Sequence, residues 1–328
     1  MRRGQFRLSM RILITGGFGF VGGRLAVHFA QLGHQIILGT RHPLTPPDWL
    51  PQAEVAIIAW DDIAALERSS DGVDVIIHAA GINAQDSATD SLAALAFNGM
   101  ATARLVVAAS RAGVNKFFYL STAHVYDSPL IGIITEETCP RNLHPYATSH
   151  LAGEQAVLSA HSRGELLGIV LRLSNAFGAP MHKDVNCWML LVNDLCKQAV
   201  QTRKLVLHSS GLQYRDFIGL TEVCCVVEKL VDSDQLNQAN VFNVGAGVSQ
   251  SALAMAQLIQ QRCIKVLGYM PELQHKQSGV DEQYSPLSYR NNNLNSLGIS
   301  CRSQKNPVEI DKLLQFCQIT FNQKEPST

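Results

Sequence analysis

The sequence predicts an α/β fold: a doubly wound parallel sheet of the Rossmann type with a smaller, interleaved C-terminal lobe. Short apolar runs alternate with helical stretches as far as Phe177, and the first run leads directly into a glycine-rich turn. Parallel strands are joined by crossover helices and are buried on both faces, so they read as continuous apolar runs. The alternation therefore indicates one sheet covered by helices on both sides.

The elements follow in order from Arg11. The expected strands are RILIT, QIILG, VAIIAW, VDVIIHAA, KFFYLST and LGIVLRLS. The expected helices lie near residues 21–32, 62–69, 91–112 and 146–163. Together they account for six strands of the sheet.

After Phe177 the rhythm changes. A loop, GAPMHKDVNCW, precedes further expected elements: a helix near 187–200, the strand KLVLH, the polar segment YRDF, the strand FNVGAG, a helix at 249–261 and a last helix near 307–318. We expect residues 10–177 to form the Rossmann domain, with sheet and helix elements returning near 205–246, and residues 178–328 to form mainly the smaller lobe. Residues 1–9, which precede Met10, are expected to be a disordered N-terminal extension, the alternative being that the start site lies at Met10.

Composition narrows the class of function. Of the 328 residues, 46% are hydrophobic and 16% charged, and the formal net charge is +0, which excludes a disordered chain and a basic nucleic-acid-binding face. No run approaches the roughly 18 apolar residues that span a bilayer, so we expect neither a membrane nor a nucleic-acid partner. The eight cysteines contain no CxxC pair, which indicates buried thiols in the cytoplasm and no metal site.

The turn after the first strand, TGGFGFVGG, predicts a bound dinucleotide. Its glycines at 16, 19 and 22 follow a strand and open a helix. The first permits the tight turn, the second lets the backbone approach a pyrophosphate, and the third lets helix and strand pack closely. The phosphates are then expected at the helix N-terminus. The expected contacts of this turn are Gly16, Phe18, Gly19, Phe20, Val21 and Gly22.

The second strand ends at Arg41, where NAD-binding proteins usually carry an acidic residue for the ribose hydroxyls. An arginine pairs with a 2′-phosphate instead, which favours NADP(H) over NAD(H). The alternative is a solvated loop charge. Asp61 and Asp62 are open to two interpretations. Either they hydrogen-bond the adenine amino group, or they form the N-cap and acidic first turn of the following helix.

Several further motifs resemble one enzyme family. They are HAAG at 78–81, Asn98 with Thr102, STAHVY, PYATSHLAGEQ, LRLSNAFG, YRDFI and FNVGAG. With the glycine turn, this set resembles the extended short-chain dehydrogenases/reductases, the NAD(P)-dependent epimerases and dehydratases that mostly act on nucleotide sugars. The resemblance covers about residues 10–250. It implies cofactor contacts from Ile63, Ala79, Ala80, Gly81 and Asn98 besides the residues above, a substrate-binding C-terminal lobe and a homodimer.

The resemblance also implies the catalytic residues. In the family a Ser or Thr and a Tyr bind the substrate oxygen, and by position these are Thr122 and Tyr146. A lysine four residues after the Tyr supplies the positive charge that lowers the phenol pKa. Here that residue is His150, mostly uncharged at neutral pH when unperturbed. Tyr146 and His150 would also contact the cofactor.

Three interpretations of His150 remain open: a slow but active enzyme, an imidazole protonated by bound phosphates, or a cofactor-binding protein that has lost catalysis. Family members that dehydrate sugars carry Asp and Glu where this chain has Ala123 and His124, so dehydration and decarboxylation are not expected. His124 is read either as a substitute acid or as a histidine that packs or caps at a strand end. His78 is read as the end of a buried strand.

Substrate residues are implied at Asn175 and Arg215, where relatives contact a nucleotide diphosphate. An ion pair between Arg215 and Asp216 is the alternative. The family's Arg-Pro-Gly-Asp segment is absent, the chain reading QSGVD at 277–281. We therefore predict an NAD(P)-dependent nucleotide-sugar epimerase or 4-ketoreductase. The alternative is a catalytically impaired NADP-binding regulatory or scaffold protein.

Overall fold

The computed structural model describes residues 9–236, 239–277, 286–301 and 305–322. The contacts divide the chain into two compact units. The first comprises residues 1–121 and 144–170, and the second comprises residues 122–143 and 171–328. The predicted N-terminal extension, 1–9, lies outside the described residues except for its last member.

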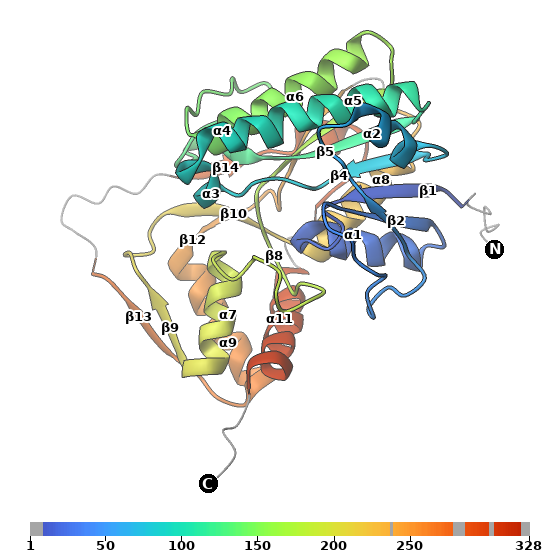
Figure 1. Cartoon of the computed structure of the whole chain (residues 1–328). Coiled ribbons are helices and arrows are strands. Elements are labelled where there is room, and N and C mark those ends of the chain that lie inside the picture. The colour runs from blue at the N-terminus through green and yellow to red at the C-terminus, as the bar shows by residue number, and fades with distance from the viewer. Residues whose placement is uncertain (1–8, 237–238, 278–285, 302–304, 323–328) are drawn as a thin grey trace, which may run out of the picture. The chain divides into compact units, whose positions relative to one another are not determined.

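The main sheet has seven strands in the order β11-β7-β5-β4-β1-β2-β3 (Figure 1). Their bounds are β1 Arg11–Thr15, β2 Gln35–Thr40, β3 Glu54–Ile57, β4 Val75–His78, β5 Lys116–Thr122, β7 Leu167–Leu173 and β11 Val241–Val244. The pairs β1–β2, β1–β4, β2–β3 and β4–β5 are parallel. The predicted doubly wound sheet, with its six apolar runs and the FNVGAG strand, is confirmed.

Register places three side chains in a row across neighbouring strands, at the carboxyl ends of β1 and β4 and in the middle of β5. Thr15 is opposite His78, and His78 is opposite Tyr119. Ligands of open α/β sheets bind outside the carboxyl ends of the strands. This row therefore lies directly beneath the expected cofactor site.

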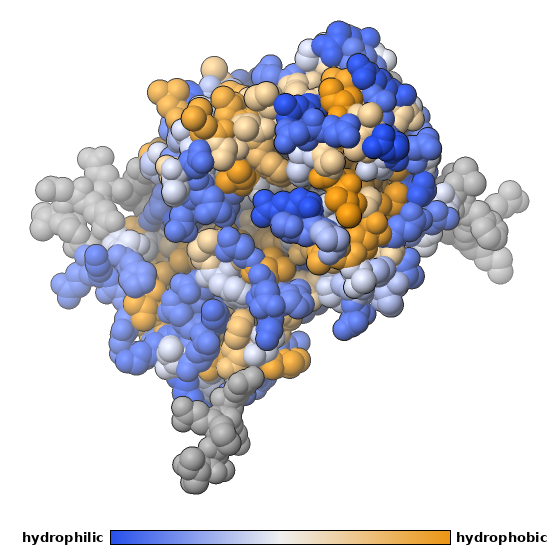
Figure 2. All heavy atoms as spheres, in the orientation of Figure 1, coloured by the Kyte–Doolittle hydropathy of each residue, from blue (hydrophilic) through white to orange (hydrophobic). Residues whose placement is uncertain are grey.

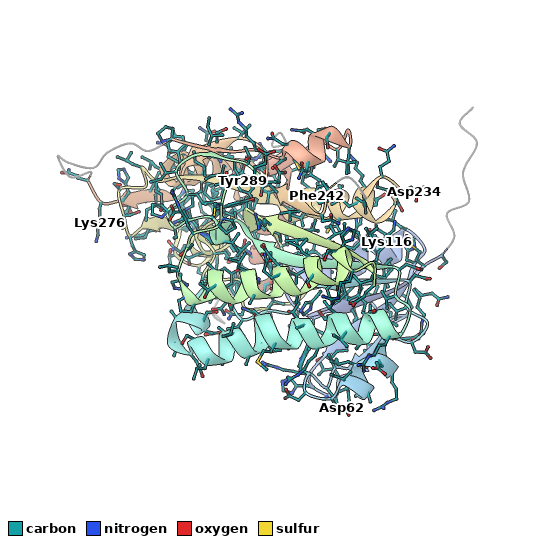
Figure 3. All side chains as sticks on the ribbon, turned by 90° about the horizontal axis from the view of Figure 1, so that it is seen from above. Asp62, Lys116, Asp234, Phe242, Lys276 and Tyr289 are labelled. Carbon is teal, nitrogen blue, oxygen red and sulfur yellow. The ribbon has the colours of Figure 1, made fainter. Side chains whose placement is uncertain are left out.

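Several helices of the first unit begin at a side chain that caps them. They are α1 Phe20–Gln31, α2 Ile63–Ser70, α3 Ala84–Thr89, α4 Ser91–Ala94, η1 Leu95–Ala101, α5 Thr102–Arg111 and α6 Pro145–Ser162. Asp62, Asn83 and Asp90 cap α2, α3 and α4 through their side chains. Segments α4, η1 and α5 form one continuous helix, Ser91–Arg111, which runs beside α6 (Figures 1 and 3).

The middle of that helix is a π-helix, a feature that the sequence did not predict. Segment η1, Leu95–Ala101, has the wider π turn, and Asn98 lies within it. Short π segments inside α-helices occur frequently at functional sites. The predicted helix at 91–112 is thus confirmed in extent, with a local change of winding at Asn98.

The second unit has its own small sheets and its own core. Its elements are η2 Ala123–Val125, β6 Gly132–Ile134, β8 Asn175–Phe177, α7 Leu191–Thr202, β9 Lys204–Leu207, β10 Tyr214–Gly219, α8 Leu220–Val231, β12 Ser249–Ser251, α9 Ala252–Leu267, β13 Glu272–His275, β14 Leu287–Tyr289, α10 Asn292–Ser296 and α11 Asn306–Phe321. The small sheets are β12-β10-β8, β13-β9 and β14-β6. Helices α7, α9 and α11 bury a shared apolar core, including Leu195, Ile259 and Leu314.

The structure departs from the prediction at two places in this unit. Helix α8 follows β10 directly and was not predicted, although its buried residues Leu220, Val223, Val227 and Leu230 recur with helical spacing. Helix α7 begins at Leu191 rather than near 187.

Among the residues that the structure describes, one helix is long and apolar enough to span a membrane, contrary to the expectation from the sequence. It is Ser91–Arg111, and half of its most apolar stretch is buried inside the protein. Its exposed apolar side chains include Leu92 and Met100, 79% and 54% exposed. Figure 2 shows hydrophobic residues at the surface around α4.

Candidate functional site

The glycine turn of the first unit has room for no side chain. Gly16 has a φ of +67°, in the left-handed region. A Cβ on Gly22 would lie 2.2 Å from the Gly16 carbonyl oxygen. That carbonyl accepts the Gly19 N–H at 2.8 Å, and Gly19 leaves the start of α1 without a side-chain cap. The turn is therefore a close-packed cradle at an uncapped helix N-terminus, which fits a pyrophosphate.

The loop after β4 packs against this cradle. A Cβ on Gly16 would lie 2.8 Å from the Ala80 amide nitrogen, so the Gly16 backbone lies directly on Ala79 and Ala80. On its other side, Gly81 faces Asn98 and His150: a Cβ there would lie 3.5 Å from Asn98 Oδ1 and 3.6 Å from His150 Cε1. The predicted cofactor residues of these two loops are thus neighbours in one unit.

Asn98 joins the loop to α6. Its Oδ1 accepts the Ile82 N–H at 2.8 Å, and its Nδ2 donates to the Ile82 carbonyl at 3.3 Å and to Ser149 Oγ at 3.0 Å. The side chain is 1% exposed. These bonds occupy the amide, so Asn98 supports the two segments that border the site.

Tyr146 and His150 lie together at the start of α6. Their ring centroids are 4.6 Å apart with an interplanar angle of 71°, an edge-to-face contact. The α6 N-terminus is capped by His144, whose Nδ1 accepts the Tyr146 N–H at 3.2 Å, with Pro145 in the first turn. The helix therefore presents the phenol and the imidazole on the same side, one turn apart.

His150 is uncharged at physiological pH. Burial lowers its pKa to about 4, because the low-dielectric surroundings disfavour the imidazolium. Its Nδ1 lies 2.9 Å from the Tyr119 hydroxyl. The residue that replaces the family's lysine therefore supplies no positive charge.

A chain of hydrogen bonds runs from Thr15 and His78, in the row beneath the site, to helix segments α5 and η1. Thr15 Oγ1 lies 2.6 Å from His78 Nδ1, and His78 Nε2 lies 2.9 Å from Thr102 Oγ1, which donates to the Asn98 carbonyl at 2.7 Å. Burial lowers the pKa of His78 to about 3, so this imidazole is also neutral. His78 connects β1 to η1 and α5 as a buried structural residue.

The expected adenine-ribose contacts lie after β2 and β3. Arg41 follows β2 and is exposed. Asp62 caps α2, its Oδ1 accepting the Ala65 N–H at 3.0 Å, and Ile63 opens that helix, while Asp61 pairs with Arg104. Asp62 thus forms the helix cap that the second interpretation describes. Figure 3 labels this residue at the start of α2.

In the second unit, Thr122 ends β5. It is 5% exposed, and its Oγ1 accepts the His124 N–H at 3.1 Å as the cap of a short 3₁₀ turn. The His124 carbonyl accepts from Asn142 Nδ2 at 2.7 Å.

Asn175 and Arg215 lie on paired strands of this unit. Strands β8 and β10 are parallel neighbours, with Asn175 opposite Phe217, and Asn175 Nδ2 donates to the Asp216 carbonyl at 3.1 Å. The Arg215 guanidinium donates to Gln213 at 3.1 Å and burial lowers its pKa.

Asp216 points away from Arg215, as successive residues of a strand do. It is fully buried, and its Oδ1 accepts from Ser174 Oγ at 2.6 Å and from the Ala246 N–H at 2.7 Å. The alternative interpretation of Arg215 as half of an ion pair with Asp216 is therefore wrong.

Comparison with known proteins identifies the family. The sequence model of the NAD dependent epimerase/dehydratase family matches residues 12–245. The chain belongs to this family. The extended short-chain dehydrogenase/reductase resemblance is thereby confirmed, and with it the general kind of protein, an enzyme that uses a nicotinamide cofactor.

Individual relatives of the epimerase/dehydratase family are distant. An uncharacterized UDP-glucose epimerase of Bacillus subtilis (strain 168) is 26% identical over 76% of this chain and 81% of its own length. A dTDP-6-deoxy-L-talose 4-dehydrogenase (NAD(P)(+)) of Kitasatospora kifunensis is 29% identical over 76% of this chain and 78% of its own.

A solved structure shares the fold. The UDP-glucose 4-epimerase of Thermotoga maritima, solved with UDP-glucose, superposes with a TM-score of 0.79 at 19% identity, covering 95% of this chain and 99% of that one.

Three side chains without a predicted role contact the predicted site residues. Tyr119, Ser149 and Thr102 contact His150, Asn98 and His78 respectively. Thr102 stood in a quoted motif without a role. Tyr119 lies three residues before the end of the apolar strand β5, and its hydroxyl, a polar atom on a buried residue that needs a partner, is the signal that could have indicated a site contact.

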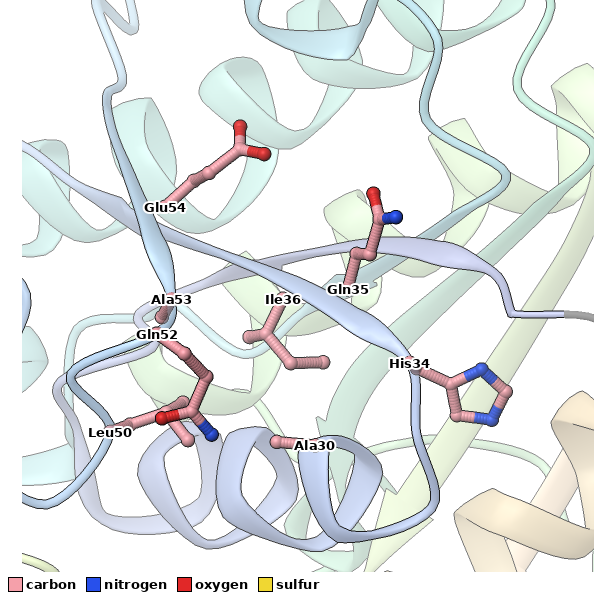
Figure 4. Close-up of a pocket in the computed structure, with 8 residues that line it drawn as sticks. All are labelled: Ala30, His34, Gln35, Ile36, Leu50, Gln52, Ala53 and Glu54. Carbon is pink, nitrogen blue, oxygen red and sulfur yellow. The ribbon is translucent and has the colours of Figure 1, made fainter.

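A separate cavity of the first unit lies at the opposite ends of the strands. Its lining includes His34, Gln35, Leu50 and Glu54, around the amino ends of β2 and β3 (Figure 4). None of the predicted site residues lines it. Because ligands of such sheets bind at the carboxyl ends, this cavity is not the cofactor site.

Proposed function

We propose that this protein is an NADP(H)-dependent 4-ketoreductase of nucleotide sugars, in which Tyr146 and Thr122 bind the sugar C4 oxygen. The observation that carries the proposal is the Tyr146–His150 contact at the start of α6, in the same unit as the glycine cradle. The relative named as a dTDP-6-deoxy-L-talose 4-dehydrogenase supports redox chemistry at C4.

The neutral His150 favours reduction over epimerisation. A phenol has a pKa near 10 in water, and an uncharged imidazole adds no positive charge to lower it. A protonated phenol is the acid that a carbonyl reduction needs, whereas epimerisation begins by oxidising an alcohol and needs a base. Epimerisation is the second candidate, favoured by the relative named as a UDP-glucose epimerase.

Each of the following residues has its own role in the proposed reduction. Bound NADPH supplies the hydride. Gly16, Gly19 and Gly22 hold the pyrophosphate against the first turn of α1, and Arg41 pairs with the 2′-phosphate. Tyr146 gives its hydroxyl proton to the C4 oxygen.

The remaining contacts belong to the loops and to the second unit. Ala79, Ala80 and Gly81 border the cofactor, with Asn98 holding their loop to α6. Thr122 donates a second hydrogen bond to the C4 oxygen. Asn175 and Arg215 bind the diphosphate of the sugar nucleotide, a group that an arginine recognises through charge-assisted, bidentate bonds.

The neutral imidazole of His150 also favours the alternative function, that of an NADP-binding regulatory or scaffold protein. If the phenol without a neighbouring charge does not transfer its proton, the protein binds NADP without turnover and serves as a regulatory or scaffold protein. The lowered pKa argues against the interpretation in which bound phosphates protonate His150, because burial opposes that protonation.

One experiment separates these functions. NADPH consumption is followed with a panel of nucleotide 4-ketosugars and nucleotide sugars, beside a Tyr146→Phe control, and products are resolved by chromatography. Stoichiometric NADPH oxidation that the control lacks supports the reductase. A mixture of C4 epimers without net oxidation assigns epimerisation, and tight NADP binding without turnover assigns the regulatory role.

We further propose a homodimer formed by the helices 91–112 and 146–163 of each subunit. The support is the apolar exposure of the first helix, where Leu92, Leu95 and Met100 are 79%, 46% and 54% exposed. Large exposed apolar patches mark interaction surfaces.

We also place the protein in the cytoplasm. All eight cysteines are described and free, five of them buried, as expected in a reducing compartment. Cys139 is exposed, contrary to the expectation that each thiol is buried.

A further inference from the structure

Tyr119 and His150 form a buried pair beneath the cofactor loops. Tyr119 is 1% exposed and His150 is 5% exposed. The phenol oxygen lies 2.9 Å from His150 Nδ1 and 3.4 Å from the Asn98 carbonyl oxygen. The shorter contact has the length of a normal hydrogen bond, and the longer one is at the limit.

The protons in this cluster can be assigned from the neighbours. The Tyr119 O–H has two acceptors within reach, the Asn98 carbonyl at 3.4 Å, which also accepts the Thr102 hydroxyl, and His150 Nδ1 at 2.9 Å. We assign the proton to the shorter contact, with His150 Nδ1. A neutral imidazole carries one proton, so an Nδ1 that accepts leaves the proton on Nε2.

Packing holds the Tyr119 hydroxyl in this place. Gly153 lies on α6 close to one turn after His150, and a Cβ there would lie 2.6 Å from the Tyr119 oxygen and 2.5 Å from the Asn98 oxygen. The hydroxyl therefore touches the helix backbone where a side chain is missing. Glycine at 153 permits the approach that the His150 hydrogen bond requires.

The other ring nitrogen faces the cofactor loop. A Cβ on Gly81 would lie 3.7 Å from His150 Nε2. The loop Ala79–Gly81 is also the segment that touches the glycine cradle. A proton on Nε2 is thus presented toward the segment expected to border the cofactor.

We propose that Tyr119 is a positioning residue that holds His150 in its Nε2–H tautomer, so that His150 offers an uncharged hydrogen-bond donor to a ribose hydroxyl of the nicotinamide nucleotide. An Nε2–H of His150 would donate a hydrogen bond, as the family's lysine does, but would supply no positive charge. The identity of the ligand rests on the proposed function, whereas the tautomer is a property of the unliganded protein.

The tautomer is tested by ¹⁵N NMR on the full chain with labelled histidine and no nucleotide, at pH 7.5. The His150 signals are assigned from their loss in His150→Gln. We expect an unprotonated Nδ1 and a protonated Nε2 in the wild type, and a changed tautomer ratio in Tyr119→Phe. A wild-type His150 that carries its proton on Nδ1 overturns the proposal.

Nucleotide binding provides the second arm. Tyr119→Phe is expected to weaken NADPH binding by about fivefold, the size of one hydrogen bond, and to lose this effect in the His150→Gln background. Tyr289→Phe is the control, since Tyr289 is equally buried and its hydroxyl bonds to Arg172 and Asn243 instead.

The NMR measurement and the binding measurement test different parts of the proposal. An equal loss in both backgrounds means that Tyr119 does not act through His150, and overturns the positioning role. If the wild type binds no nicotinamide nucleotide, the proposed function fails, while the NMR result still decides the tautomer.

Discussion

The rings of Tyr146 and His150 meet edge to face at 4.6 Å, four residues apart on α6. The contact places a neutral imidazole where the family has a lysine ammonium. Charge beside the phenol is therefore the property that most distinguishes this site.

His150→Lys is expected to raise the turnover of a nucleotide 4-ketosugar by about tenfold or more at pH 7.5, because a cation beside the phenol stabilises the phenolate that remains once the proton has passed to the C4 oxygen. Steady-state NADPH oxidation measures the change. Gln155→Lys adds the same charge at an exposed position of α6 and is expected to have no effect. An unchanged rate with His150→Lys, with NADPH still bound, would favour the regulatory protein.

The folded protein is expected to lose stability in acid through His150. Its pKa falls from 6.5 in the unfolded chain to about 4 in the fold, so the unfolded state binds more protons between these values. This contribution is complete above pH 6.5 and declines as the pH falls toward 4, with a loss of about 2 kcal/mol by pH 5.

Urea denaturation at pH 7.5 and pH 5 of the wild type and His150→Gln isolates that contribution. The variant should lose less stability on acidification than the wild type. Burial raises the pKa of Asp216 to about 6, which acts in the opposite sense, but this carboxyl is present in both proteins and cancels in the comparison. Equal pH dependence of the two proteins would contradict the prediction.

Arg41→Ala is expected to weaken NADPH binding by about tenfold or more and to leave NADH binding unchanged, because the guanidinium recognises only the 2′-phosphate. Titration of nucleotide fluorescence measures both affinities. Arg68→Ala, also exposed and in the first unit, is the control for a general loss of positive charge. Equal losses for both nucleotides would mean that Arg41 does not set cofactor preference.

Gly22→Ala is expected to lower the stability of the fold by about 1–3 kcal/mol and to abolish nucleotide binding, because the added methyl would meet the Gly16 carbonyl at 2.2 Å. Thermal denaturation with and without NADPH gives both effects. For stability the control is Gly81→Ala, whose methyl would meet its neighbours at ordinary distances of 3.5 Å and more. A Gly22→Ala protein that NADPH still stabilises would refute the cradle.

The double substitution Leu92→Glu with Met100→Glu is expected to convert a dimer into a monomer, since two charges would have to be buried in the proposed helix interface. Analytical ultracentrifugation measures the mass. Ile319→Glu, on α11 and 87% exposed, is the control for a charge at another apolar surface position. A wild type that is already monomeric would reject the proposed dimer.

The sheet could be predicted from the sequence because its strands are short, apolar and separated by helices and caps. The glycine turn was predictable for a similar reason: only glycine fits Gly16 and Gly22, so the sequence must show it. Both features depend on local chain chemistry.

The support of the site could not be predicted in the same way. The Tyr119–His150 bond joins residues 31 positions apart, and the π turn at Asn98 leaves no periodicity that distinguishes it from an α-helix. These features are decided by packing between segments.

The π turn at Leu95–Ala101 has a consequence for the whole of helix Ser91–Arg111. Each residue of an α-helix turns the next by about 100°, so deleting one residue from the wide turn would rotate the preceding segment, with Leu92, relative to Thr102 by about that angle. The single wide turn therefore fixes two orientations together: the outward direction of Leu92 and the inward direction of Asn98. A regular helix of the same sequence length would have to give up one of them.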